Sequence, residues 1–180
     1  LPRTAAPAAE PAAPAGAPAP ELPPYVLPPV TLLGEGDHAR NPESDRELQE
    51  TALRLKNTLG TFGVEVTIPQ VSQGPAVTRY ELLPAQGVKV SRIVSLQDDI
   101  KLNLAAADIR IEAPIPGKAA IGIEVPNRNI SSVALRDLFE ADAYRNFRGR
   151  LAFAVGKDIG GNVVVSDIAK MPHMLIAGAT

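Results

Sequence analysis

The sequence predicts a mixed α/β (α+β) protein, in which a small two-layer α/β sandwich is followed by the first strands of a second α/β unit. Three observations predict this fold class. Helical and strand periodicities alternate in the order α-β-β-α-β-β-α over residues 44–141. Beyond about residue 142 the strands become short, uninterrupted apolar runs, a pattern typical of strands covered on both faces. Ahead of both parts, residues 1–30 are dominated by proline and alanine.

Composition excludes several functional classes. The 180 residues carry a net charge of −2, no cysteine and two histidines, His38 and His173. A near-neutral charge argues against a domain that coats nucleic acid, and the lack of cysteine excludes disulfides, thiolate zinc sites and cysteine nucleophiles. The apolar runs are far shorter than the roughly 18 residues that span a bilayer, and the start has no signal-peptide pattern. Because residue 1 is not Met, we expect a fragment or a processed product.

Residues 1–24 are predicted to be a disordered Pro/Ala-rich linker. Proline removes amide donors and disfavours helix at the residue before it, and alanine buries too little apolar surface to offset chain ordering. A Pro-rich docking peptide is the alternative, although a PxxP-plus-basic pattern is missing. We expect residues 25–30 to be an extended lead-in packed on the folded part. Ten of the 18 prolines lie in the first 30 residues: Pro2, Pro7, Pro11, Pro14, Pro18, Pro20, Pro23, Pro24, Pro28 and Pro29.

The first predicted helix covers residues 44–62, and two strands follow it. Ser44 with Glu47 is typical of a capping box, and Gly63 suits the left-handed position after a helix. Alternating apolar residues then predict strands at 64–68 and 76–82, joined by a turn. The apolar stripe of the helix, spaced by three and four residues, consists of Leu48, Ala52, Leu55, Leu59 and Phe62.

A second helical region is predicted at residues 91–106, with a break near Asp98-Asp99. Strands at 109–112 and 121–125 follow, and then a short helix capped by Ser131 or Ser132. Its inward-facing residues would be Val133, Leu135, Leu138 and Phe139. The core positions of the second helical region would be Ile93, Leu96, Ile100 and Leu104.

The last part of the chain changes character, and we place a domain boundary near Asp142. Apolar strands are predicted at 151–155, 163–165 and 174–177, as in a nucleotide-binding sheet. The last of these strands leads into Gly178, Ala179 and Thr180. A strand that meets a glycine is how a phosphate-binding G-x-x-x-x-G-K-[ST] loop begins. An ordinary turn is the alternative, because the Lys and Ser/Thr of that loop are not in the sequence.

Several longer motifs, in order, carry a resemblance to the motor region of the FtsK/SpoIIIE DNA translocases. The resemblance covers roughly Leu27 to Thr180. The motifs are GPAVTRYE at 74–81, GVKVSRI at 87–93, IRIEAPIPGK at 109–118, IGIEVPN at 121–127, GKDIGG at 156–161 and AKMPHMLIAGAT at 169–180.

The resemblance implies a linker at 1–24, a translocase α domain at 25–141 and the beginning of a RecA-like ATPase β domain at 142–180. It implies that Gly178, Ala179 and Thr180 open a Walker A loop in which the chain is cut short. We therefore expect no hydrolysis by this fragment and no tight binding of a cofactor. The parent would be a DNA-dependent ATPase that uses ATP and Mg²⁺.

The resemblance also implies a parent that is a homohexamer pumping double-stranded DNA in chromosome partition and cell division. This segment would be cytoplasmic and make no membrane contact. The parent would be anchored in the inner membrane at the division septum. Its partners there could include other cell-division proteins. The alternative is a stand-alone α/β interaction module with a Pro-rich docking arm. A small-molecule P-loop enzyme is a third hypothesis.

Individual charged and aromatic residues allow two interpretations each. Arg79, Arg110 and Arg128 could reach across a subunit interface, but we expect Arg79 and Arg110 to pair with Glu65, Glu81 or Glu112 across the sheet. Residues 144–150, with sequence YRNFRGR, could contact a phosphate backbone, but we expect the rings to pack inward.

The remaining polar candidates have structural explanations that we prefer. Lys157 and Asp158 fit a solvated turn better than a catalytic pair. Asp98 and Asp99 fit a helix start better than a metal pair. His173 fits a packed structural histidine better than a proton carrier.

Overall fold

The structure is a computed structural model, and it describes residues 26–36 and 45–177. The predicted linker at 1–24 and the predicted cap Ser44 lie outside these residues. The order of elements predicted from the sequence is confirmed, including the division of the second helical region, except that α5 is added and the strand predicted at 174–177 is not formed. In chain order the elements are η1 (Val30–Leu32), α1 (Asp45–Thr61), β1 (Val66–Gln73), β2 (Val77–Pro84), α2 (Val90–Ser95), α3 (Gln97–Leu104), β3 (Arg110–Glu112), β4 (Ile121–Pro126), α4 (Leu135–Glu140), α5 (Asp142–Arg145), β5 (Ala152–Lys157), β6 (Val163–Asp167) and η2 (Ile168–Lys170).

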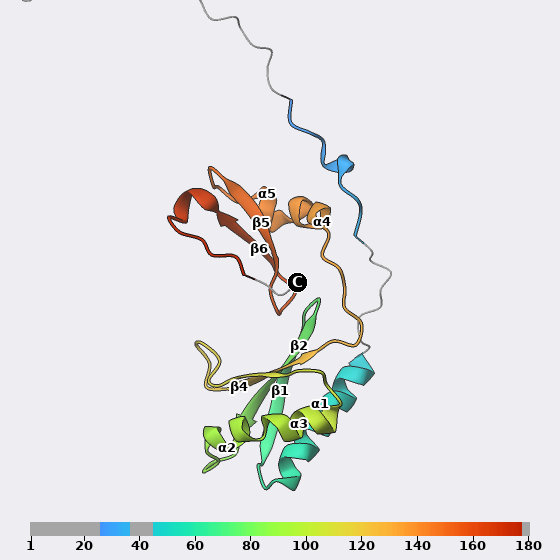
Figure 1. Cartoon of the computed structure of the whole chain (residues 1–180), viewed down its shortest axis with the longest axis vertical. Coiled ribbons are helices and arrows are strands. Elements are labelled where there is room, and N and C mark those ends of the chain that lie inside the picture. The colour runs from blue at the N-terminus through green and yellow to red at the C-terminus, as the bar shows by residue number, and fades with distance from the viewer. Residues whose placement is uncertain (1–25, 37–44, 178–180) are drawn as a thin grey trace, which may run out of the picture.

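The first unit is the predicted two-layer sandwich. Its four strands form a sheet in the order β1-β2-β4-β3, and every neighbouring pair is antiparallel. Helices α1, α2 and α3 cover one face of this sheet (Figure 1). No helix of the described residues covers the other face, so its side chains satisfy their polar groups among themselves or with solvent.

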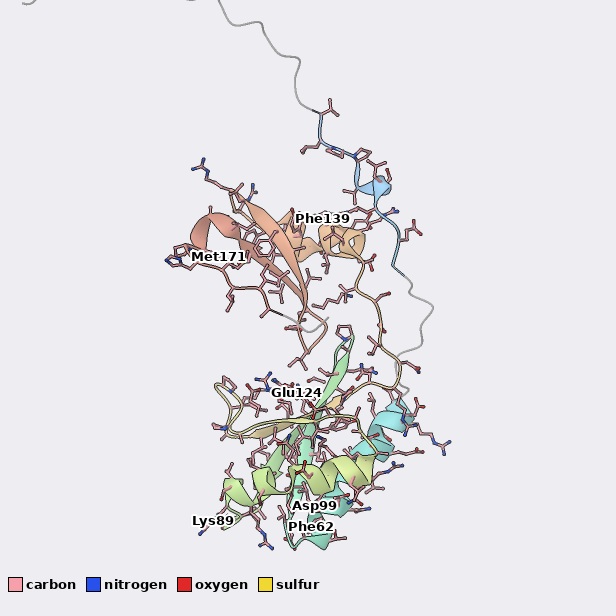
Figure 2. All side chains as sticks on the ribbon, viewed as in Figure 1. Phe62, Lys89, Asp99, Glu124, Phe139 and Met171 are labelled. Atoms are coloured by element: carbon pink, nitrogen blue, oxygen red, sulfur yellow. The ribbon has the colours of Figure 1, made fainter. Side chains whose placement is uncertain are left out.

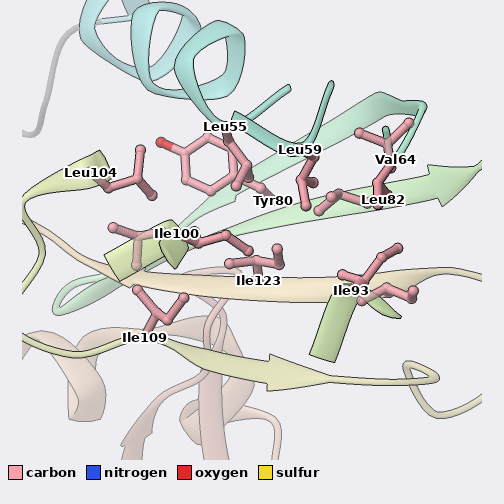
Figure 3. Packing of buried hydrophobic residues seen from close by; sticks show 13 residues of the cluster. Leu55, Leu59, Val64, Tyr80, Leu82, Ile93, Ile100, Leu104, Ile109 and Ile123 are labelled. Carbon is pink, nitrogen blue, oxygen red and sulfur yellow. The ribbon is translucent and has the colours of Figure 1, made fainter. Parts of the chain in front are cut away.

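The core lies between the helices and the sheet, and it uses most of the residues that periodicity predicts, although Phe62, predicted in the apolar stripe of the first helix, is 37% exposed. Leu55 and Leu59 of α1 have no exposed surface, and they meet Tyr80, Leu82 and Ile123 of the sheet (Figure 3). Removing a leucine side chain of this size from water contributes about 2 kcal/mol, which makes this contact the main attachment of α1. The core also includes Val64, Val66, Ile93, Ile100, Leu104, Ile109, Ile121 and Val125.

The predicted end of α1 is confirmed. Gly63 has a φ of 70°, in the left-handed region where a side chain would be strained. The amide of Val64 donates to the carbonyl of Leu59 at 2.9 Å. This carbonyl of the last helical turn thereby gains a hydrogen bond from the residue after the helix. The chain can then reverse immediately and place Val64 in the core.

One predicted helix start is confirmed and another differs from the structure. The division predicted near Asp98-Asp99 falls at Leu96, which has a φ of −89° and a ψ of 10°, so that α3 begins just before Asp98. The cap predicted at Ser131 or Ser132 is wrong, because α4 follows an extended Ala134 that makes no side-chain capping bond. Of the residues predicted to face inward around α4, Leu138 is buried, whereas Leu135 is 44% exposed.

The second unit consists of the antiparallel hairpin β5–β6 with α4 and α5 beside it. The prediction that strands 151–155 and 163–165 are covered on both faces is wrong. Leu151 and Val155 are more than half exposed. The reason is that, among the described residues, β5 and β6 pair only with each other and are packed from one side.

An aromatic pair joins the two helices of this unit. The rings of Phe139 on α4 and Tyr144 on α5 have centroids 4.7 Å apart and are tilted by 47°. The Tyr144 hydroxyl donates to the carbonyl of Ala152 on β5 at 3.4 Å. The pair therefore ties α4 and α5 to the start of the hairpin.

The chain passes between the two units more than once. The segment 26–36 precedes α1, yet η1 contacts α4 of the second unit. Arg136 of α4 donates through Nη1 to Glu35 at 3.0 Å. In the predicted lead-in at 25–30, residue 25 lies outside the described residues, and the prediction of packing is wrong for Val26 and Leu27, which are exposed.

Strand β1 forms one border of the four-stranded sheet, and its pairing is irregular. The register with β2 shifts between Thr67 and Gln70. Pro69, which has no amide hydrogen, lies inside this interval. The other border, β3, is only three residues long.

Candidate functional site

The predicted phosphate-binding residues Gly178, Ala179 and Thr180 lie outside the described residues. The segment that leads to them does not have the predicted form. Residues 174–177 form no strand, and Leu175 and Ile176 are 92% and 81% exposed. A strand requires hydrogen-bonded neighbours, and the described part of the chain offers none at this place.

Asp167 fixes the base of the β5–β6 hairpin. Its carboxylate accepts hydrogen bonds from the amides of Leu151 at 3.1 Å, Ala169 at 3.0 Å and Arg150 at 3.3 Å. Burial acts to raise the pKa of this carboxyl, but the three amide donors and the nearby Lys170 outweigh burial, so the pKa lies below its usual range. Asp167 thus fixes where η2 begins, on the path towards residues 178–180.

Sequence reasoning missed Asp167, although a signal existed. An Asp between an apolar strand and a short helical turn is a common N-capping residue, and the Asp167 side chain does accept from Ala169. The longer-range bonds to Arg150 and Leu151 have no such local signal.

The turn between β5 and β6 is held by Asp158. Its carboxylate accepts from the side-chain amide of Asn162 at 3.1 Å and from the backbone amide of the same residue at 2.8 Å. These two bonds lower the pKa of Asp158. The residue is exposed, and its partner is Asn162 rather than Lys157. The prediction of a solvated turn is therefore confirmed.

The helix-free face of the four-stranded sheet carries an ion cluster of Arg79, Glu112 and Glu124. Arg79 donates from Nη2 to Glu112 at 2.7 Å and to Glu124 at 2.6 Å, from the middle of β2. Glu124 lies between the core residues Ile123 and Val125, so it points away from the helices (Figure 2). The pairing of Arg79 with Glu112 is confirmed, and Glu124 is a further partner that the sequence did not indicate.

A second ion pair on the same face belongs to the loop before β4. Lys118 contacts both carboxylate oxygens of Glu81, at 2.7 and 2.9 Å. Ile115 of this loop lies over Gly122, where a Cβ would meet its Cγ1 at 3.2 Å. Glycine at this strand position therefore lets the loop lie flat on the sheet and bury Ile115.

These contacts confirm the paired interpretation for Arg79, whereas the interpretations of Arg110 and Arg128 stay predictions. Arg79 has two carboxylate partners and a side chain that is only 19% exposed, so it is not available to a neighbouring subunit. Arg110 is opposite Glu124 in the sheet register and is exposed. Arg128 is exposed and lines a small cavity of about 70 Å³ together with Arg54 and Tyr80.

The basic and aromatic segment 144–150 shows the arrangement that we expected. Tyr144 packs on Phe139, and Phe147 is half-buried. Arg145 and Arg148 are exposed. The rings are therefore used for packing and are not available as a stacking platform for bases.

The structure also shows where the remaining polar candidates, Asp98, Asp99 and His173, lie. Asp98 and Asp99 lie in the first turn of α3, as expected. His173 is exposed, so the prediction that it is a packed histidine is wrong. Among the described residues no group of three or more His, Asp or Glu side chains could hold a metal ion.

An open groove of about 830 Å³ lies in the described part of the molecule. It lies between the last turns of α1 and the ends of β1 and β2, and its lining includes Lys56, Thr61 and Glu65. In the described ranges no helix is both long and apolar enough to pass through a membrane.

A buried network at the turn between β1 and β2 brings together residues that are far apart in sequence. The side-chain amide of Asn127 donates to the carbonyl of Gly74 at 2.8 Å, and its oxygen accepts from the Thr78 hydroxyl at 2.8 Å. The Asn127 backbone amide donates to Ala76 at 2.9 Å. Sequence reasoning missed this network, because Asn127 and Gly74 are 53 positions apart.

Comparison with known proteins gives two consecutive family matches. Residues 27–127 match the family described as the FtsK alpha domain. Residues 134–180 match the FtsK/SpoIIIE family.

Several proteins that are similar in sequence to this chain are named DNA translocases. The chain is 55% identical to the DNA translocase FtsK of Clostridium acetobutylicum over 157 residues, which is 87% of this chain and 20% of that protein. It is 55% identical to FtsK of Caldanaerobacter subterraneus over the same share of this chain and 22% of that protein. It is 46% identical to the DNA translocase SpoIIIE of Bacillus subtilis over 156 residues, 87% of this chain and 20% of that protein.

The chain spans about a fifth of the length of these relatives. The FtsK alpha domain match covers more than half of the chain and includes the whole four-stranded sheet with the three helices that cover it. The chain belongs to the FtsK/SpoIIIE family, with an FtsK alpha domain at residues 27–127.

Proposed function

We propose that this chain is the coupling part of an ATP-driven motor that translocates double-stranded DNA. It would comprise the α domain and the start of the ATPase β domain. The observation that carries this proposal is the pair of family matches, in order, on two separately packed units. The names of the relatives, DNA translocases, support DNA as the partner of the parent protein.

We propose a linker at 1–24, an α domain that begins at residue 25 and the beginning of the β domain at the C-terminal end. The boundary predicted near Asp142 remains a prediction. The contacts of α4 with β5, and of α5 with β6, favour placing it earlier, in the segment 127–134 between β4 and α4. A boundary in that segment would keep each helix with the strands on which it packs.

The nucleotide would be ATP with Mg²⁺, bound by the intact parent. Gly178, Ala179 and Thr180 would open the phosphate loop, and their backbone amides would approach the phosphates. The Lys and hydroxyl of a complete loop would come from residues after Thr180. The described residues of this chain would then position the loop rather than take part in hydrolysis, and we expect the fragment to bind no nucleotide tightly.

The family suggests how the parent is assembled and where it acts. We propose a homohexamer that works at the division septum in chromosome partition and cell division, with this segment on the cytoplasmic side of an anchored protein. Other cell-division proteins are possible partners of the parent. The four-stranded unit would act as a stiff body that moves with the ATPase ring.

The test compares the complete reading frame with the chain of residues 1–180. We expect the complete protein to hydrolyse ATP faster when double-stranded DNA is added and to displace a third strand from a DNA triplex. The chain 1–180 should do neither. Hydrolysis that is indifferent to DNA would instead indicate a small-molecule P-loop enzyme. A reading frame that stops at Thr180 would indicate a stand-alone interaction module.

A further inference from the structure

The turn between β1 and β2 is the place where three distant segments of the chain meet. Asn127, just after β4, donates to this turn from its backbone amide and its side-chain amide, and its side-chain oxygen accepts from Thr78 of β2. Ser131, four residues later, donates its amide to the carbonyl of Pro75 at 2.8 Å. The segment that leaves the four-stranded sheet is therefore fixed to the turn at two points before it runs to α4.

The hairpin β5–β6 reaches the same turn from the other unit. Figure 1 shows the two hairpins approaching each other tip to tip. A Cβ on Gly74 would lie 2.8 Å from the carbonyl oxygen of Ile159, at the tip of the β5–β6 hairpin, and 3.1 Å from the carbonyl oxygen of Val77. Contact at this distance with backbone atoms leaves no room for a side chain, so glycine is required for the two tips to touch.

The Asn127 network makes the turn stiff. Asn127 and Thr78 are both buried, and each bond in the network satisfies a group that would otherwise be unpaired away from water. Strand β2, which begins at this turn, lies in the interior of the sheet between β1 and β4. A displacement of the turn would therefore move the sheet as a body rather than bend one border of it.

We propose that this contact is a mechanical joint, formed by residues 73–76, Asn127 and the β5–β6 tip at 158–161. Through it the second unit pushes on the four-stranded sheet. Asn127 is a positioning residue that keeps the turn rigid under that push. The proposal rests on the proposed function, because it assigns the joint to the transfer of movement from the ATPase domain to the α domain. Residues 132–134, which have no regular structure, connect this turn to α4.

Two substitutions in the complete translocase test the joint. Gly74→Ala places a methyl group against the carbonyl of Ile159 and separates the tips. Asn127→Asp keeps the acceptor for Thr78 but removes the donor to Gly74. We expect each variant to retain DNA-stimulated ATP hydrolysis while it moves DNA more slowly. The ATP consumed per base pair translocated should rise about two- to thirtyfold, the range over which single mutations usually change the coupling between sites.

Matched controls are available in the first unit. Gly60→Ala changes a glycine of α1 with no atom within 4 Å of the new Cβ. Asn103→Asp removes an exposed amide that donates to the carbonyl of Asp99 at 3.0 Å, a bond like that of Asn127 but in solvent. Both controls should leave the ATP consumed per base pair unchanged.

The outcomes separate the joint from the function on which it rests. If hydrolysis and translocation fall in parallel, or if neither changes, the joint transmits nothing and the proposal is wrong. If Gly74→Ala fails to fold, as judged by its thermal transition, Asn127→Asp decides. If both fail to fold, the turn is needed for folding and its coupling role is rejected. Absence of DNA-stimulated hydrolysis in the unaltered protein would overturn the proposed function itself.

Discussion

Asp167 joins the start of β5 and the end of β6 with one carboxylate. Three backbone amides, from both sides of the hairpin, donate to it. Its pKa is lowered despite burial, so the carboxylate is bound more favourably in the folded chain than in the unfolded one. One side chain therefore organises the base of the second unit.

The lowered pKa of Asp167 predicts acid sensitivity of this hairpin. A depressed folded-state pKa gives stability that is complete above the unfolded-state pKa and is lost as the pH falls through the folded-state pKa. We expect the amides of Leu151 and Ala169 to lose protection from hydrogen exchange when the pH is lowered below about 4, the usual range of an Asp carboxyl. Asp167→Asn should reduce their protection already at neutral pH.

The control for this prediction is Glu50→Gln, which removes an exposed carboxyl of α1 in the other unit. It should leave the protection of Leu151 unchanged. Protection factors measured by NMR correct for the pH dependence of intrinsic exchange. If protection at Leu151 and Ala169 is the same at pH 3 and pH 7, the carboxylate does not hold the hairpin.

At the scale of elements, α1 is attached to the four-stranded sheet through a narrow stripe of buried apolar side chains. Leu55 and Leu59 are fully buried, whereas Leu53 on the same helix is 59% exposed. The C-terminal turn closes on Gly63, and this directs the chain into Val64 and β1. The attachment of α1 therefore depends on few side chains.

Leu59→Ala should destabilise the first unit by about 2–5 kcal/mol, because it removes buried methyl groups and leaves a cavity under α1. Leu53→Ala, on the exposed side of the same helix, should change the free energy of unfolding by about 0.5 kcal/mol or less. Urea unfolding followed by circular dichroism measures both. Equal effects of the two substitutions would show that the core side of α1 is wrongly placed.

The elements that could be predicted from the sequence are those whose signals are local. The stripe of α1, the left-handed Gly63 and the alternation of β2 and β4 each depend on neighbours within a few positions, so their periodicity is readable. The exposure of Leu151 and the lack of a strand at 174–177 depend on which other strands are present. Such pairing is not contained in the local pattern.

The candidate site was predictable to a similar degree. Gly178, Ala179 and Thr180 were identified from a motif and a resemblance, and they remain a prediction. Arg79 was expected to pair across the sheet because its strand alternates, which is a local signal. Asn127 and Asp167 were missed because most of their hydrogen bonds reach segments that only the folded chain brings together.

At the scale of the whole molecule, the segment 26–36 is attached to the second unit although the first unit follows it in sequence. The ion pair of Glu35 with Arg136 makes this attachment, next to the contact of η1 with α4. Arg136 also contacts Glu140 within α4 at 3.0 Å. The incoming chain is therefore held beside the unit that we assign to the ATPase domain.

Glu35→Gln should release this segment without unfolding either unit, because an exposed ion pair contributes little to overall stability. Limited proteolysis should cut within residues 26–36 faster than in the unaltered chain, while the thermal transition is unchanged. Glu140→Gln, which removes the other partner of Arg136, should leave the cleavage rate as it was. Unaltered cleavage in Glu35→Gln would mean that η1 alone holds the segment.

The irregular border strand β1 has a consequence for how copies of this protein behave at high concentration. An open, regular strand border offers free amides and carbonyls to which a foreign strand can add, and this is a route to aggregation. Here the shift between Thr67 and Gln70, with Pro69 inside it, interrupts that row of groups. The opposite border offers only the three residues of β3. At high concentration, copies of this protein can therefore contact one another along β1 and β3 without forming a continuous intermolecular sheet.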